Sequence, residues 1–181
     1  PRSDDAIAVA GLICDEQGDS TSAIRLWEQA MALPQDAVQV CPRADVCYQL
    51  GYARLLREQY SQAITALRES VRLNPRRSET HFRLAHACFL AGNLEETLQT
   101  LDAAKLDSPL AERLRGQVYQ QKEQWPEAKR SFEAAVRRYP EFAEAYYGLA
   151  TACERLGETA LAETNRARFN ALKAVGQAEG R

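Results

Sequence analysis

The sequence has 181 residues, of which 45% are hydrophobic and 27% charged, and its formal net charge is −2. This composition is ordinary for a soluble globular protein, and it offers no basic excess that would favour binding to nucleic acid phosphates. No apolar run approaches the roughly 20 residues that a membrane-spanning helix requires, and no signal peptide or lipidation motif is recognisable.

The first residue is Pro1 rather than Met, so we expect a processed or excised part of a longer protein. We expect a soluble fragment, with the compartment open between the cytoplasm and the periplasm or export. Lysine occurs only as Lys105, Lys122, Lys129 and Lys173 among 23 basic residues. This excess of arginine is typical of GC-rich, commonly bacterial genomes. The sequence leaves the oligomeric state open.

Apolar residues at helical spacing, interrupted by glycine and proline, predict helices throughout the chain and no strand. The predicted helices cover residues 4–17, 20–33, 44–58, 61–73, 78–91, 94–106, 109–123, 126–139, 142–156 and 159–174. Gly18, Gly92 and Gly157 lie at turns between helices, where a left-handed residue costs glycine little. Prolines are predicted to end three helices: Pro75, Pro109 and Pro140. The segment 177–181 is expected to be a frayed tail.

A pattern of small and large apolar residues returns along the chain, which indicates internal repeats. One repeat has Gly116, Tyr119, Ala128, Phe132, Ala135 and Pro140 at offsets 0, 3, 12, 16, 19 and 24. Other repeats keep parts of this pattern: Gly51, Ala63, Leu67 and Pro75; Ala85, Cys88, Leu101, Ala104 and Pro109; Gly11, Cys14, Ala23, Trp27 and Ala30; Ala150, Cys153, Ala162 and Phe169. Small residues at offsets 0, 12 and 19 allow two helices to cross closely, and the large residue at offset 16 fills the space beside them.

This pattern resembles the tetratricopeptide repeat (TPR), a helix–turn–helix unit of about 34 residues. Five repeats start near residues 4, 44, 78, 109 and 143, and the resemblance covers nearly the whole chain. It implies an all-α, right-handed α-solenoid of about five hairpins, forming a single TPR domain over residues 1–176. The fourth position of each repeat departs from the Trp of the family, most of all at Glu112, so helix packing is least certain there.

The cysteines and histidines do not form a metal site in this pattern. Cys14, Cys88 and Cys153 share one repeat position and are expected to be buried small hydrophobic residues. Cys41 and Cys47 flank the sequence PRAD, and they form either a disulfide or, as we favour, two free thiols. His81 is expected in the core and His86 on the groove, because five residues separate them by roughly 140° around a helix.

No catalytic or phosphate-binding motif is recognisable, so we expect no catalytic residues, no metal ligands and no cofactor. Basic pairs such as Arg137 and Arg138 are local and offset by acidic residues, so RNA binding is disfavoured.

The resemblance implies that the first helix of each repeat lines a concave groove. Its second, fifth, ninth, twelfth and thirteenth positions would then be exposed, among them Leu55 in repeat two. We predict that partner-binding residues lie there: Tyr48, Tyr52, Phe82, His86, Phe89, Arg113, Gln117 and Tyr147. Exposed aromatic clusters more often mark contact sites than accidents of packing, although packing against a neighbouring segment stays an alternative.

The resemblance therefore favours a protein–protein interaction module that binds a peptide or helix of a partner protein in its groove. The alternative is a regulatory or docking segment of a larger enzyme or secretion-machinery protein. TPR proteins that bind the acidic C-termini of chaperones use Lys and Asn at the fifth and ninth positions. Here repeat two has Tyr48 and Tyr52 at these positions, so that particular function is disfavoured.

Overall fold

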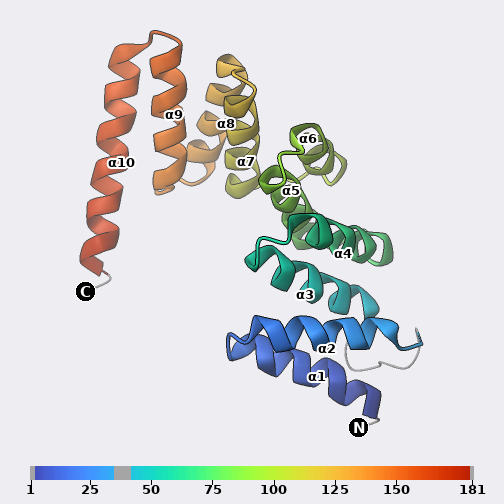
Figure 1. Ribbon diagram of the computed structural model, residues 1–181. Helices are drawn as coiled ribbons and strands as arrows, with labels where there is room; N and C mark the ends of the chain where they lie inside the picture. Colours follow the sequence, from blue (N-terminus) through green and yellow to red (C-terminus); the bar gives the residue numbers. More distant parts are fainter. Residues whose placement is uncertain (1–2, 35–41, 180–181) are drawn as a thin grey trace. The chain divides into compact units, whose positions relative to one another are not determined.

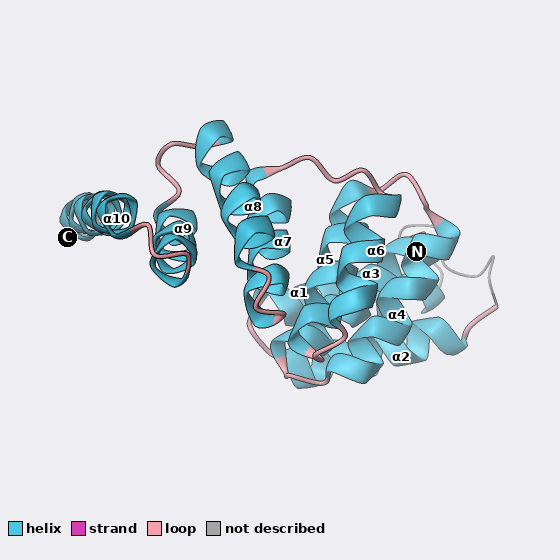
Figure 2. Cartoon of the chain, turned by 90° about the horizontal axis from the view of Figure 1, so that it is seen from above, coloured by secondary structure: helices cyan, strands magenta, loops and turns pink. Residues whose placement is uncertain are grey.

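The computed structural model describes residues 3–34 and 42–179, and within these ranges all regular elements are α-helices (Figure 2). The all-α class expected from the sequence is therefore confirmed. Contacts between residues divide the chain into two compact units, the N-terminal unit of residues 1–100 and the C-terminal unit of residues 101–181. The single domain over residues 1–176 stays a prediction.

The N-terminal unit is built from helices that follow one another side by side (Figure 1). Its helices are α1 (Ser3–Glu16), α2 (Ser20–Ala32), α3 (Arg43–Leu56), α4 (Tyr60–Leu73), α5 (Ser78–Leu90) and α6 (Leu94–Ala103), whose last residues cross into the C-terminal unit. Each helix from α1 to α4 contacts the next, and α3 also contacts α5. Trp27 lies in one apolar cluster and Leu67 in a second. Because each hairpin adds its apolar face to the next, stacking builds the core.

The C-terminal unit repeats this arrangement with α7 (Pro109–Gln121), α8 (Trp125–Arg138), α9 (Ala143–Arg155) and α10 (Thr159–Glu179). Successive helices contact, and α7 also contacts α9. The fully buried ring of Phe132 lies in an apolar cluster with Leu149 and Cys153.

Small residues at offset 0 bring the two helices of a hairpin close together. A Cβ atom added to Gly51 would lie 2.6 Å from Leu67 Cγ, and one added to Gly116 would lie 2.7 Å from Phe132 Cε1. Contacts below 3.0 Å are not tolerated by real Cβ atoms. The predicted pairing of offset 0 with the large residue at offset 16 is therefore confirmed in both units.

The turn inside each hairpin has one left-handed residue at offset 7. Gly18, Gly92 and Gly157 have φ values of 77°, 80° and 78°. Glu58 and Glu123 occupy the same repeat position with φ values of 59° and 56°. The next amide closes each first helix, for example through Gln59 N–H to Arg54 O at 2.9 Å. The glycine turns are confirmed, and two repeats use glutamate in the same backbone shape.

Three helix ends differ from the sequence prediction. Helix α6 ends at Ala103 rather than 106, because Lys105 takes a left-handed φ of 47° and Leu106 N–H bonds Leu101 O at 3.0 Å. Pro109 does not end a helix but begins α7, after the Ser108 side chain caps it by accepting from Ala111 N–H. Helix α10 continues to Glu179, beyond the expected end at 174 and into the segment expected to fray.

Two charged residues stand where the repeat pattern calls for large apolar ones. Glu112 has a largely buried side chain, and its Oε1 lies 3.7 Å from Arg115 Nε. Arg166 takes the offset-16 position of the last repeat, which Trp27, Leu67 and Phe132 occupy elsewhere. It is exposed and pairs with Glu154 at 2.8 Å. Ion pairing thus allows both helices to carry charge at these positions.

Candidate functional site: the first helices of repeats two and three

Two stacked aromatic pairs lie on the first helices of repeats two and three. The rings of Tyr48 and Tyr52 on α3 are 6.4 Å apart with an interplanar angle of 11°. Phe82 and His86 on α5 are 6.2 Å apart at 10°. Both pairs are four residues apart, so one turn of helix places each pair on one side. Two of the predicted partner-binding residues therefore lie together on each of these helices.

Arg77, directly before α5, and Arg83, within α5, cover the two tyrosines of α3. The guanidinium of Arg77 lies 4.1 Å from the centre of the Tyr48 ring, and that of Arg83 lies 4.5 Å from the Tyr52 ring. Such cation–π contacts favour guanidinium because its plane stacks on the ring face. The two helices are thus joined across this face by guanidinium–tyrosine stacking rather than by direct contact between aromatic pairs.

Tyr48 is a packed residue rather than an exposed one. Only 6% of it is exposed, and its hydroxyl donates to Glu79 Oε1 at 2.5 Å. Arg77 pairs with Asp45 and lies 3.7 Å from Glu79. Burial, followed by the hydrogen bond to Glu79, raises the pKa of Tyr48. The expected exposure of Tyr48 is wrong because Arg77 and Glu79 enclose it.

Leu55, also expected in the groove, is buried in the core cluster that contains Leu67. Leu55 occupies position twelve of repeat two. The residue at position twelve of repeat three, Phe89, is half-buried instead.

The accessible part of this surface includes Tyr52 and Leu56 on α3 and extends over a longer part of α5. Tyr52, Phe82, His86 and Phe89 are half-buried. Leu56 is 56% exposed and Leu90 40% exposed, and each lies four residues after Tyr52 or His86. Both leucines occupy position thirteen of their repeats, so the two helices present equivalent apolar ends. We call the set Tyr52, Leu56, Phe82, Arg83, His86, Phe89 and Leu90 the α3–α5 face.

Arg83 was missed as a functional residue by the sequence reasoning. Its guanidinium stacks on Tyr52, and its buried Nε has no hydrogen-bond partner. No carboxylate pairs with it in the described ranges 3–34 and 42–179. The sequence held one signal, since Arg83 follows Phe82 directly and lies among the aromatic positions of α5.

The three predicted site residues of the C-terminal unit divide into two places. Arg113 and Gln117 lie on α7, where Arg113 Nη1 donates to Gln117 Oε1 at 3.1 Å. Burial lowers the pKa of Arg113, and its guanidinium lies 5.6 Å from the Phe142 ring centre. Tyr147 on α9 is 55% exposed, and its ring is 5.3 Å from that of Phe169 on α10.

The described cysteines are free thiols. Cys88 and Cys153 are fully buried, as expected, while Cys14 is half-buried against the first core cluster. Cys47 is buried and donates its S–H to Met31 Sδ at 3.4 Å, so it is not in a disulfide. Cys41 lies outside the described residues. Burial raises the pKa of Cys47 to about 11 and that of Cys88 to about 12.

His81 is not a core residue. It is half-buried, and its Nε2 lies 2.9 Å from the Pro75 carbonyl oxygen in the turn before α5. The ring thus satisfies a turn carbonyl that has no helical partner. Within the described ranges, no group of three or more His, Cys, Asp or Glu side chains is placed to hold a metal ion.

Comparison with known families decides the classification. Two family models described as tetratricopeptide repeat match the sequence, one over residues 54–117 and one over residues 113–168. The chain belongs to the tetratricopeptide repeat family. Membership of the TPR family supports a role as a protein–protein interaction scaffold. Among the described residues, no helix is long and apolar enough to cross a membrane.

Solved TPR-type structures of MamA share this fold. MamA 41-end from Desulfovibrio magneticus RS-1 is 18% identical over 97% of each chain, with a TM-score of 0.85. A MamA RS-1 ArsTM double mutant has the same TM-score of 0.85 at 18% identity over 98% of each chain. A further MamA protein is 21% identical, with a TM-score of 0.79 over 93% of this chain and 91% of its own. No curated protein sequence matches. These identities establish similarity of fold only.

Proposed function

We propose that this TPR chain binds a peptide or helix of a partner protein on the α3–α5 face. The observation that carries the proposal is the guanidinium of Arg83, stacked on Tyr52 without a carboxylate partner among the described residues. Exposed Leu56 and Leu90 lie one helical turn from Tyr52 and His86. A cation beside an apolar surface favours a ligand with an acidic residue next to apolar side chains.

The chemistry of the face suits a peptide ligand. Half-buried aromatic side chains provide large contact area at a low cost in side-chain entropy. Amphipathic helices dock into apolar grooves with side chains at positions i, i+3, i+4 and i+7. We therefore expect apolar anchors near Phe89 and Leu90 and an acidic side chain near Arg83. The buried Tyr48 stabilises this face through its packing and does not contact the partner.

Arg113, Gln117 and Tyr147 of the C-terminal unit are proposed as partner contacts in their own right. Arg113 and Gln117 present linked hydrogen-bonding groups on α7. Tyr147 presents an exposed aromatic ring on α9. An arginine–amide pair and a tyrosine are both common in protein interfaces.

The experiment places a photo-crosslinking amino acid at Leu56 or Leu90, with exposed Ser61 on α4 as the control position. Crosslinked peptides are identified by mass spectrometry, synthesised, and titrated against the purified chain by fluorescence anisotropy. We expect crosslinks at positions 56 and 90 to a peptide that contains an acidic residue. Crosslinks at position 61 alone would refute the proposed location.

Two variants then test the mechanism with the synthetic peptide. Tyr52→Ala with Phe89→Ala is expected to weaken binding about a thousandfold, since each anchor contributes about 2 kcal/mol. Arg83→Gln is expected to weaken it about tenfold and to reduce its dependence on salt. Leu161→Ala, an exposed apolar residue of α10, serves as the control. Unchanged affinity in a natively helical double variant would contradict the proposal.

A further inference from the structure

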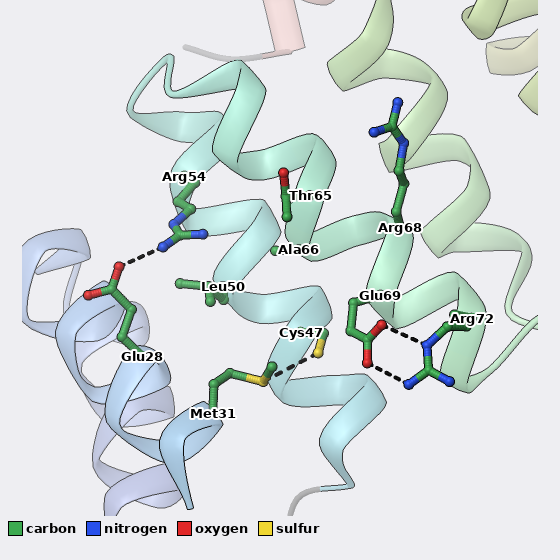
Figure 3. A pocket seen from close by; sticks show the side chains of 10 residues that line it. All are labelled: Glu28, Met31, Cys47, Leu50, Arg54, Thr65, Ala66, Arg68, Glu69 and Arg72. Carbon is green, nitrogen blue, oxygen red and sulfur yellow. Dashed lines mark hydrogen bonds and ion pairs between the residues drawn. The ribbon is translucent and has the colours of Figure 1, made fainter.

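A pocket of about 600 Å³ opens in the N-terminal unit on a different surface from the α3–α5 face. It is lined by residues of α2, α3 and α4, with Leu50 and Ala66 between two ion pairs (Figure 3). Pockets of roughly 300–1,000 Å³ suit small molecules rather than whole helices. Its size therefore indicates a small ligand.

The floor of the pocket is apolar and contains sulfur. Met31, Cys47, Leu50 and Ala66 contribute it, and Cys47 S–H points to Met31 Sδ at 3.4 Å. Because Cys47 is buried with a pKa raised to about 11, its thiol stays neutral at physiological pH. Neutral thiol, thioether and aliphatic groups together form a surface for a hydrocarbon chain.

The rim of the pocket carries three arginines: Arg54, Arg68 and Arg72. Arg72 is paired with Glu69 at 2.7 Å and Arg68 with Glu96 at 2.5 Å, each through two nitrogens. Arg54 differs, since Nη2 bonds the half-exposed Glu28 at 2.6 Å, Nη1 reaches the Gln62 carbonyl oxygen only at 3.5 Å, and its buried Nε has no hydrogen-bond partner. An unsatisfied buried donor on a cation is costly. Arg54 is therefore the rim group best suited to accept an added anion.

We propose that this pocket binds a single-chain anionic amphiphile, with its carboxylate on Arg54 and its hydrocarbon chain over Met31, Leu50 and Ala66. The carboxylate accepts hydrogen bonds from the Nη groups of Arg54 and shares the guanidinium with the half-exposed Glu28. The chain replaces water on the apolar floor, which is the main source of affinity. This site does not depend on the α3–α5 face or on its partner.

The single methionine of the sequence makes the test specific. Met31 lines the pocket, so the ¹³C-labelled methyl group of Met31 reports ligand entry by NMR. Titration with laurate is expected to shift this signal saturably below the micelle concentration. Dodecyltrimethylammonium, which has the same chain and a positive head, is expected to bind at least tenfold more weakly. No saturable shift with laurate, or equal binding of the two amphiphiles, overturns the proposal.

Three variants locate the ligand. Ala66→Leu fills the pocket and is expected to abolish the laurate shift, whereas Arg54→Gln is expected to weaken it about tenfold. Arg57→Gln changes an exposed arginine directly after the same helix, outside the pocket, and is the control. Far-ultraviolet circular dichroism verifies helicity in each. Wild-type affinity for laurate in a folded Arg54→Gln chain refutes the head-group assignment. Wild-type affinity for laurate in a folded Ala66→Leu chain refutes the pocket as the binding site.

Discussion

Phe132 lies against Gly148 so closely that a Cβ atom on the glycine would be 2.4 Å from the ring atom Cζ. The same ring faces Gly116 on its own hairpin, where an added Cβ would be 2.7 Å from Cε1. The ring thus lies directly against glycines of two successive repeats. Packing between repeats in the C-terminal unit depends on the absence of these two side chains.

We expect Gly148→Ala to lower the free energy of unfolding by about 1–3 kcal/mol, because overpacking exceeds the gain in helix propensity. Gly176→Ala in α10 is the matched control, since no atom lies within 4 Å of its added Cβ. The control is expected to stabilise by about 0.5–1 kcal/mol. Urea denaturation of both variants measures the difference. Equal effects at the two glycines would contradict the packing described for Phe132.

The left-handed glutamates predict a stabilising change. Replacing Glu58 or Glu123 with Gly is expected to raise the free energy of unfolding by about 0.5–1 kcal/mol, because glycine adopts positive φ without strain. Removing an acidic side chain from a helix C-terminus also favours the dipole. The reverse change, Gly157→Ala, is expected to destabilise by about 1 kcal/mol. Thermal denaturation measures the change in stability of each variant. A loss of stability in Glu58→Gly would contradict backbone strain at this turn.

Tyr48 is expected to contribute more to stability than Tyr52. Tyr48→Ala removes a buried ring and should destabilise by about 3–5 kcal/mol, whereas Tyr48→Phe loses one hydrogen bond to Glu79 and should cost about 1 kcal/mol. Tyr52→Ala, at a half-buried ring, should cost less than Tyr48→Ala. Chemical denaturation of the three variants tests this order. If Tyr52→Ala is the more damaging, Tyr52 belongs to the core rather than to the accessible face.

The buried glutamate predicts a pH effect. Burial raises the pKa of Glu112 in the folded state, so the folded state holds this proton more tightly than the unfolded state. Its ionisation therefore costs stability as pH rises above the ordinary value of 4.5, and the full cost is present at neutral pH. We expect Glu112→Gln to raise Tm relative to wild type at pH 7, with a smaller difference at pH 4. Glu141→Gln, at an exposed position, is the control; a benefit that grows toward pH 4 would reverse the assigned sign.

The thiols predict selective protection. Cys47 and Cys88 are fully buried with raised pKa values, and Cys153 is buried with a pKa also raised by burial. Because the thiolate is the reactive form, iodoacetamide at pH 8 should label these three only after unfolding. Peptide mapping with and without guanidinium chloride measures the labelling. Rapid native labelling of Cys88 would place it outside the core.

Sequence alone predicted the features that recur with the repeat. Gly51 against Leu67 and Gly116 against Phe132 follow from offsets that alternate small and large residues. The left-handed turns at Gly18, Gly92 and Gly157 follow from glycine itself. Glu58 and Glu123 show the same turn without that signal, because neighbouring helices fix the backbone more strongly than residue preference does.

Side-chain contacts between helices could not be predicted from the sequence. Tyr48 looked exposed from its repeat position, yet Arg77 and Glu79 from the next hairpin enclose it. Repeat position sets the direction of a side chain but not what covers it. The pocket beside Arg54 likewise combines side chains of α2, α3 and α4 that have no common spacing in the sequence. Long side chains that reach across helices therefore decide the surface.

Arg166 determines which neighbours α10 can accept. In the hairpin before it, Phe132 meets a glycine of the following helix, α9. A helix packed on α10 in that same way would have to enclose the Arg166–Glu154 ion pair, and desolvating such a pair is costly. The hydration of this ion pair therefore decides what can pack on α10. Water or a polar surface of matching charge is favoured there, and the apolar packing found between the other helices of the unit is disfavoured.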